Sequence, residues 1–156
     1  MTQSEFDDWS AGKSYEHYMG RWSRKIATKF IDWVDPPADI AWLEIGCGTG
    51  ALTAAVLSQA SPSSILSTDR SKVFFAHARA EIMDDRAIFQ VADATALPCP
   101  DASVDVVTSG LVFNFIPDTQ IALAEMRRVL RPGGMAAFYV WDYPGGGMGF
   151  IDAFWK

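Results

Sequence analysis

Short apolar stretches alternate with longer amphipathic stretches along most of the chain, and this alternation predicts its elements. Runs such as Asp105-Val-Val-Thr and Ala136-Ala-Phe-Tyr-Val are apolar at neighbouring positions, as in strands that are covered on both faces. The predicted strands span residues 40–45, 64–68, 87–91, 104–108 and 135–141, the predicted helices span 51–60, 72–84 and 119–130, and a turn is predicted at 131–134. Strands separated largely by helices predict a mostly parallel, doubly wound α/β sheet with right-handed crossovers.

A segment of different character precedes the first strand. Aromatic and basic residues alternate from Ser14 onward, and Trp22, Ile26 and Phe30 then recur at helical spacing. Asp35-Pro36-Pro37 ends this pattern, because proline cannot continue a helix. The sequence therefore predicts one or two leading helices before the sheet.

Length and composition fit one domain. The chain has 156 residues, of which 49% are apolar and 21% charged, and these values are typical of a globular protein with a single core. The longest apolar run, Met135–Trp141, is much shorter than the roughly 18 residues of a membrane span. The amino terminus is acidic where a signal peptide would be basic. We therefore expect an unexported, cytoplasmic protein without a membrane-spanning segment.

Charge and the scarcity of metal-binding side chains argue against further classes. The net charge of −6 repels the phosphate backbones of nucleic acids, which proteins engage with clustered lysine and arginine. Cys47 and Cys99 are too few for a disulfide framework, and together with His17 and His77 they show no metal-ligand spacing. We expect neither a nucleic-acid partner nor a metal site.

Three glycines at alternate positions follow the first predicted strand. In Leu43-Glu-Ile-Gly-Cys-Gly-Thr-Gly50 they allow a sharp turn from strand to helix and let a ligand lie against bare main chain. The loop alone leaves the ligand open, since Gly46, Gly48 and Ala51 also match the G-x-G-x-x-A pattern of nicotinamide-binding folds. Residues outside the loop have to show whether the ligand is a nicotinamide dinucleotide or another molecule.

Acidic residues stand at the carboxyl ends of the first three predicted strands. Glu44 precedes the first glycine by two positions, Asp69 ends the second strand and Asp93 follows the third. Open α/β sheets bind their ligands at this edge. Asp69 lies 19 residues after Gly50, about the spacing at which a carboxylate accepts two ribose hydroxyls, and Asp93 would then face an adenine amino group.

The combined pattern resembles the class I S-adenosylmethionine-dependent methyltransferases, in the small-molecule branch that includes ubiquinone and menaquinone enzymes. The matching motifs are Glu44-Ile-Gly-Cys-Gly-Thr-Gly50, Asp69, Asp93-Ala-Thr-Ala-Leu-Pro98, Ser103-Val-Asp-Val-Val107 and Leu130-Arg-Pro-Gly-Gly134. The resemblance covers about residues 14–142 and implies a Rossmann-like sheet of strand order 3-2-1-4-5 that binds S-adenosylmethionine. The chain would then comprise an amino-terminal tail (1–13), a leading helical lid (14–37), the cofactor-binding core (38–143) and a glycine-rich turn with the start of a further helix (144–156).

The resemblance implies roles for individual residues. Glu44 would hold the amino-acid end of the cofactor through a network, Asp69 would accept its ribose hydroxyls, and Asp93 would accept from its adenine amino group. The other implied contacts are Gly46, Cys47, Gly48 and Gly50 along the carboxypropyl and ribose faces, Arg70 and Ala94 at the adenine, Ser109 under the methyl group, and Tyr18 and Trp22 over the methionine end. No catalytic residue is implied, because aligning two bound reactants supplies about 7–11 kcal/mol and a general base only about 10²–10⁴-fold.

The chain departs from the family pattern at its carboxyl end. The family sheet normally adds two antiparallel strands after the fifth, and the sequence stops at Lys156 before they would occur. We therefore expect a truncated chain in which strand 135–141 is an exposed edge that favours a homodimer.

Three functions stay open at this point. One is a methyltransferase acting on a small organic acceptor, and another is a truncated S-adenosylmethionine-binding module with weak or no turnover. A nicotinamide-dependent oxidoreductase is the third, although it gives Glu44, Asp93 and the turn at 131–134 no role.

Four other side chains have simpler interpretations. Asn114 stands roughly where enzymes that methylate amino groups of nucleic acids have an Asn/Asp-Pro-Pro-aromatic signature. No pair of prolines follows it, so we interpret it as a loop residue. Cys47 lies where a thiol pKa can fall, but no partner base is evident, and a small side chain tolerated in a tight loop explains it. His77 is interpreted as a solvated helix residue, and His17 is a candidate for facing the acceptor.

Overall fold

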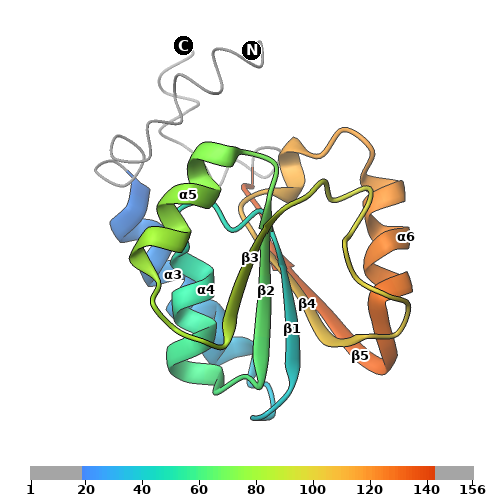
Figure 1. The fold of residues 1–156 in the computed structure, drawn as a ribbon, viewed down its shortest axis with the longest axis horizontal. Helices are drawn as coiled ribbons and strands as arrows, with labels where there is room; N and C mark the ends of the chain where they lie inside the picture. The colour runs from blue at the N-terminus through green and yellow to red at the C-terminus, as the bar shows by residue number, and fades with distance from the viewer. Residues whose placement is uncertain (1–18, 143–156) are drawn as a thin grey trace.

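The computed structural model describes residues 19–142, which fold around one five-stranded sheet (Figure 1). The strands are β1 (Ala41–Ile45), β2 (Ser64–Asp69), β3 (Ala87–Val91), β4 (Val104–Gly110) and β5 (Leu130–Tyr139). All neighbouring strands pair in parallel, in the order β3-β2-β1-β4-β5. This confirms the predicted Rossmann-like sheet and its strand order.

Helices flank the sheet on both faces (Figure 1). They are α3 (Arg21–Val34), α4 (Ala51–Ala55), which continues as the π-helical turn η2 (Val56–Ala60), α5 (Lys72–Glu81), the short 3-10 helix η3 (Phe113–Phe115) and α6 (Thr119–Val129). Between residues 19 and 142 no helix combines the length and apolar character that crossing a bilayer requires.

The sheet separates two apolar cores. On one face, Phe30 of α3 and Val56 of η2 pack with Trp42 of β1. On the other face, Met126 of α6 packs with Leu43 of β1. Successive residues of β1 therefore enter opposite cores, as a central strand covered on both faces requires.

The last strand differs from its prediction. β5 begins at Leu130, which pairs with Val104, and the next paired residue is Met135, opposite Val106. The predicted turn at 131–134 is therefore a bulge inside β5, with Asp105 opposite it. Asp105 holds this bulge in place, because its Oδ2 accepts hydrogen bonds from Arg131 at 2.7 Å and from the main-chain N–H of Ala41 at 2.8 Å.

Two predicted helices also differ in detail. The predicted helix 51–60 is α-helical only to Ala55 and then π-helical, and the predicted helix 72–84 ends at Glu81. Asp84 forms a turn of its own beyond α5, accepting the N–H of Arg86 at 2.9 Å, and the same side chains form an ion pair at 2.7 Å. The aspartate thus satisfies the main chain outside the helix.

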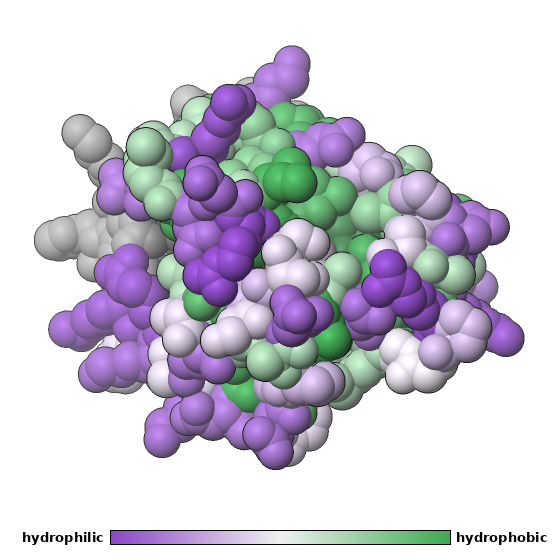
Figure 2. Space-filling model, turned by 60° about the horizontal axis from the view of Figure 1, so that its bottom comes forward, coloured by the Kyte–Doolittle hydropathy of each residue, from purple (hydrophilic) through white to green (hydrophobic). Residues whose placement is uncertain are grey.

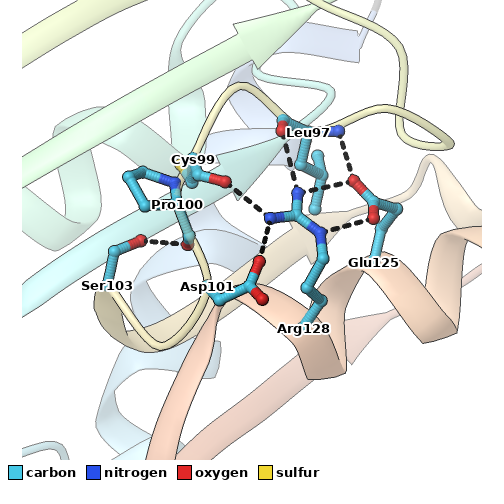
Figure 3. Close-up of polar contacts among 7 residues, drawn as sticks. All are labelled: Leu97, Cys99, Pro100, Asp101, Ser103, Glu125 and Arg128. Atoms are coloured by element: carbon cyan, nitrogen blue, oxygen red, sulfur yellow. Dashed lines mark hydrogen bonds and ion pairs between the residues drawn. The ribbon is translucent and has the colours of Figure 1, made fainter.

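The segment that links β3 to β4, residues 92–103, contains no helix and is held against α6 by the side chains of Arg128 and Glu125, which accepts the N–H of Leu97 at 2.8 Å (Figure 3). The Arg128 guanidinium donates to both carboxylate oxygens of Glu125, at 2.6 and 2.8 Å. It also donates to the carbonyls of Leu97 and Cys99 and to Asp101, at 3.1, 2.8 and 2.9 Å. All five N–H groups of the guanidinium are used, so this side chain fixes the crossover segment.

Replacing Arg128 with alanine is expected to lower the melting temperature by several degrees and to increase amide exchange at residues 97–101. The variant leaves the carbonyls of Leu97 and Cys99 without their donor and the Glu125 carboxylate without its cation. Arg127→Ala, at the neighbouring exposed position of α6, serves as the control. Equal melting temperatures and exchange rates in the two variants would contradict the role of Arg128.

One face of the sheet is uncovered toward β3. Ile88 of β3 pairs with Leu66 of β2, and Leu66 pairs with Leu43 of β1. Leu43 is fully buried and Leu66 partly buried, whereas Ile88 is 58% exposed, because the crossover after β3 supplies no helix. Figure 2 shows a largely polar surface that is interrupted by an apolar area.

Candidate functional site

The glycine loop between β1 and α4 closes over the end of β2. Gly46, Gly48 and Gly50 all have positive φ, at 74°, 53° and 91°, a conformation that side chains other than glycine rarely adopt. The main-chain N–H groups of Gly46 and Cys47 both donate to the carbonyl of Thr68, at 2.8 and 2.9 Å. The loop is therefore tied to the neighbouring strand at the carboxyl end of the sheet.

The three glycines differ in what lies in front of them. A Cβ atom at Gly46 would collide with the side chain of Val112, and one at Gly50 would lie 2.7 Å from Ile82 Cδ1. At Gly48 nothing lies within 4 Å of the added atom. Packing within the protein explains the first two glycines, whereas Gly48 leaves its main chain open to a ligand.

Asp69, at the end of β2, joins the glycine loop to the loop before α5. Its Oδ2 accepts the N–H of Gly48 at 2.9 Å and its Oδ1 accepts the N–H of Ser71 at 2.7 Å. Burial raises the pKa of this carboxyl, and the two N–H donors partly oppose that effect. Each carboxylate oxygen has a further lone pair, so Asp69 keeps the capacity to accept two ribose hydroxyls.

Asp93 and Arg70 lie next to each other beyond β3 and β2. Arg70 Nε lies 3.8 Å from Asp93 Oδ2, and both side chains are about half exposed. The N–H and hydroxyl of Thr95 donate to Asp93 Oδ1 at 2.9 and 2.7 Å, and these bonds lower the pKa of Asp93. Ala94 is buried. The structure thus brings Asp69, Arg70 and Asp93 to the ends of two adjacent strands, as the sequence predicts.

Glu44 is buried, and its carboxylate faces other protein groups. The hydroxyls of Thr53 in α4 and Ser67 in β2 both donate to Glu44 Oε2, the second at 3.0 Å. The two hydroxyls lie 3.0 Å from each other. Burial raises the pKa of Glu44 to about 7 despite these hydrogen bonds. Sequence reasoning found Glu44 but missed its two partners.

Cys47 does not have the properties of a nucleophile. The thiol is buried in the glycine loop, and burial, followed by the charges of Glu44 and Asp69, raises its pKa above the usual range. Because the thiolate is the reactive form, the alternative of an activated cysteine is wrong.

The end of β4 is tightly packed. Ser109 is fully buried, and its hydroxyl donates to the carbonyl of Ile45 at 2.8 Å, joining β4 to β1. A Cβ atom at Gly110 would lie 2.5 Å from the Tyr139 hydroxyl, and Leu111 adopts a positive φ of 61°. Ser109 therefore shapes the sheet edge, and its place under the methyl group stays a prediction.

Asn114 lies in the short 3-10 helix η3, where the sequence predicts a loop, because one helical turn forms after β4. Its side-chain Nδ2 donates to the carbonyl of Trp141 at 3.1 Å, and its Oδ1 accepts the N–H of Trp141 at 2.9 Å. This two-way pairing joins the segment after β4 to the segment after β5. The amide is consequently satisfied by the main chain.

The leading segment is described only in part. Tyr18 and His17 lie outside the described residues. Trp22, in the first turn of α3, is 48% exposed, and the guanidinium of Arg21 and the ammonium of Lys25 lie 5.1 and 5.3 Å from its ring centre. The predicted contact of Trp22 with a cofactor remains a prediction.

Glu44→Gln is expected to flatten the pH dependence of the folding free energy between about pH 5 and 8. The folded state raises the pKa of Glu44 from 4.5 to about 7, so the carboxyl stabilises the fold at acid pH and this stability is lost as the pH rises through 7. The difference corresponds to about 3 kcal/mol. Urea unfolding at pH 5 and 8 measures it, with Glu81→Gln on the exposed part of α5 as the control. Parallel pH profiles in the native protein and the Glu44 variant would contradict the assignment.

A model of a known family matches most of the core. Residues 43–138 match the family described as a methyltransferase domain. This range contains the glycine loop, Asp69, Asp93 and the bulge of β5.

Curated relatives and a solved structure agree with this match. A 27-O-demethylrifamycin SV methyltransferase of Amycolatopsis mediterranei is 40% identical over 61% of this chain and 36% of its own length. A ubiquinone/menaquinone biosynthesis C-methyltransferase of Dinoroseobacter shibae is 35% identical over 67% of this chain and 43% of its own. The solved complex of the Haloferax volcanii Trm112 methyltransferase activator with a methyltransferase contains a similar chain, with a TM-score of 0.76 and 28% identity over 90% of this chain and 62% of the other. This chain therefore spans about two fifths of the length of these curated relatives.

Proposed function

This chain belongs to the class I S-adenosylmethionine-dependent methyltransferases, and we propose that it transfers a methyl group from S-adenosylmethionine to a small organic acceptor. The observation that carries the proposal is the open main chain at Gly48, which Asp69 holds at the carboxyl end of the sheet. Asp93 and Arg70 follow at the adjacent strand ends.

The described residues fit the cofactor. We propose that Asp69 accepts the ribose hydroxyls, that Asp93, Ala94 and Arg70 surround the adenine, and that Glu44 supports the amino-acid end through its network. The glycine loop from Gly46 to Gly50 with Cys47, together with Ser109 and Trp22, completes the proposed set. When bound, the cofactor supplies an electrophilic methyl group on a sulfonium. The protein then positions the two reactants at the carboxyl end of the sheet, and we assign no catalytic base.

A small acceptor is supported by the relatives and by charge. The names of two relatives denote methylation in rifamycin and in ubiquinone or menaquinone synthesis, all of which concern small molecules. The net charge of −6 disfavours nucleic-acid acceptors. Because the chain spans only part of these relatives, activity of the chain by itself is part of the proposal.

Two measurements on the purified chain test the function. Calorimetric titration with S-adenosylhomocysteine measures cofactor binding, and a methyl-transfer assay with a panel of phenol, quinol and amine acceptors measures turnover. Binding with turnover supports the proposal. Binding without turnover points to a cofactor-binding module, and binding of NAD in place of S-adenosylhomocysteine would overturn the cofactor assignment.

We further propose that the protein acts in the cytoplasm and pairs as a homodimer along β5. Cys47 and Cys99 are both free thiols, which supports the cytoplasm because thiols stay reduced there. β5 is an edge strand of the described sheet, and Phe138 and Val140 at this edge are 38% and 46% exposed. Sedimentation at micromolar concentration tests the dimer. A monomer would contradict it and favour a different partner chain, since the Haloferax neighbour was solved with an activator protein.

A further inference from the structure

Four polar side chains are buried together on one face of the sheet. Glu44 of β1 pairs in register with Ser67 of β2 on one side and with Thr108 of β4 on the other, and Thr53 of α4 reaches it from above. Glu44 is 1% exposed and the three hydroxyl residues are fully buried. In a sheet whose neighbouring positions are apolar, such a cluster requires that its hydrogen bonds be satisfied internally.

The protons in this cluster can be counted. Three oxygens, Glu44 Oε2, Thr53 Oγ1 and Ser67 Oγ, are in mutual hydrogen-bond contact. When the carboxyl is ionised, only the two hydroxyl protons are available. Both hydroxyls can donate to Oε2, and the contact between the two hydroxyls then has no proton. With a protonated carboxyl, a third proton is present and every contact can hold one. The cluster accommodates both states, and Thr108 Oγ1, which has no partner among the described residues, lies at the paired position beside them.

The cluster is attached to both ends of the glycine loop. Glu44 lies in β1 two residues before Gly46, and Thr53 lies in the first turn of the helix that follows Gly50. Thr68, beside Ser67, donates through its hydroxyl to the carbonyl of Glu44 at 2.8 Å. A change in the charge of Glu44 therefore acts on the segments that hold the loop.

Few charged groups lie close enough to Glu44 to affect its ionisation. Asp69 of β2 is the charged group that acts on Glu44, and the Cys47 thiol is the titratable group of the loop beside it. Of the described elements packed on this face, α3, α4 and β4 contribute Ser23, Thr53 and Thr108, which carry no charge. Both neighbours oppose ionisation of Glu44 when they are themselves negative, and no cation compensates it from inside the described core.

We infer that Thr53 and Ser67 are positioning residues for the cofactor, which hold Glu44 as an anion in the bound state so that binding releases a proton from this cluster. The inference rests on the proposed function. Its physical basis is that the ammonium group at the amino-acid end of the ligand, which S-adenosylmethionine and S-adenosylhomocysteine share, favours the ionised form of a nearby carboxyl. Burial, which raises the pKa of Glu44 to about 7, leaves a proton to be released at neutral pH.

Titration calorimetry with S-adenosylhomocysteine at pH 7, in buffers of different ionisation enthalpy, tests the coupling. The native chain should release about half a proton more than Glu44→Gln, because a group with a pKa near 7 is half protonated there. The comparison removes the contribution of the ligand's own amino group, because that contribution is the same for both proteins.

Variants of the two hydroxyls separate positioning from simple packing. Thr53→Val and Ser67→Ala each remove a donor to the anion, so proton release at pH 7 should approach one, and affinity should fall about fivefold for the first unit of increase in the pKa of Glu44. Raising the pH to 8.5 should restore most of that affinity, and Thr53→Ser should match the native chain. Equal proton release in the native chain, Glu44→Gln and Thr53→Val would overturn the inference while leaving the function intact. Absence of S-adenosylhomocysteine binding in the native chain would instead overturn the proposed function, and the inference with it.

Discussion

Replacing Gly48 with valine is expected to lower the affinity for S-adenosylhomocysteine by at least about 100-fold, or about 2.7 kcal/mol. Nothing in the protein lies within 4 Å of a Cβ atom at this position, so a valine side chain would occupy the space from which a ligand approaches the main chain. The expected loss therefore arises from exclusion of the ligand. Calorimetric titration of the variant measures it.

Gly133→Val is the matched control for this variant. Gly133 also has a positive φ, at 82°, and nothing lies within 4 Å of an added Cβ, but it belongs to the bulge of β5. Both substitutions impose a similar backbone strain of about 1–2 kcal/mol. Only Gly48→Val should abolish binding, and comparable affinities in the two variants would show that Gly48 serves the turn alone.

Asp69→Ala is expected to weaken cofactor binding by about 10- to 100-fold, the range of a hydrogen bond to a charged acceptor. The substitution removes the proposed ribose acceptor, and it also leaves the N–H groups of Gly48 and Ser71 without the carboxylate that fixes them. The effect should lie toward the upper end of this range, since ligand contact and loop conformation are lost together. Asp69→Asn, which keeps one acceptor oxygen, should bind with intermediate affinity.

Asp105→Ala separates a loss of stability from a loss of binding. Asp105 also accepts a main-chain N–H and a second donor, but it lies at the amino end of β4, across the sheet from the glycine loop. We expect this variant to unfold at lower urea concentration and to bind S-adenosylhomocysteine within about twofold of the native affinity. An Asp69 variant whose affinity stays equal to the native value would remove Asp69 from the site.

The strands were predictable because each is a short run with a local signature. β2 and β3 begin and end within one residue of their predicted limits, since each contains two adjacent large apolar residues, Ile65-Leu66 and Ile88-Phe89, and polar residues follow within a few positions. The bulge in β5 was not predictable. Its sequence has the glycines and proline of a turn, but Leu130 still pairs with Val104, and that pairing depends on Asp105 in another strand.

The site was predictable where topology alone gathers residues. Asp69 and Asp93 end neighbouring parallel strands, so their proximity follows from the strand order. Thr53 and Ser67 were missed because a hydroxyl residue inside an apolar element has no distinct periodicity, and the register that places Ser67 beside Glu44 is not a local property. Ser67, which directly follows Ile65-Leu66 in β2 and lies two strand positions before Asp69, was the available signal.

The separation of β1 and β4 along the chain has a consequence for synthesis on the ribosome. The hydrogen bond from Ala41 to Asp105 joins residues 64 positions apart. One side of β1 therefore has no neighbouring strand until β4 has been synthesised. At elongation rates of about 5–20 residues per second, that side of β1 stays unpaired for roughly 3–13 s after it is made. β2 and β3 emerge first and can pair with β1 in the meantime. The nascent chain therefore carries a half-built sheet with Trp42 and Leu43 incompletely covered, and this interval is when chaperone binding would protect it most.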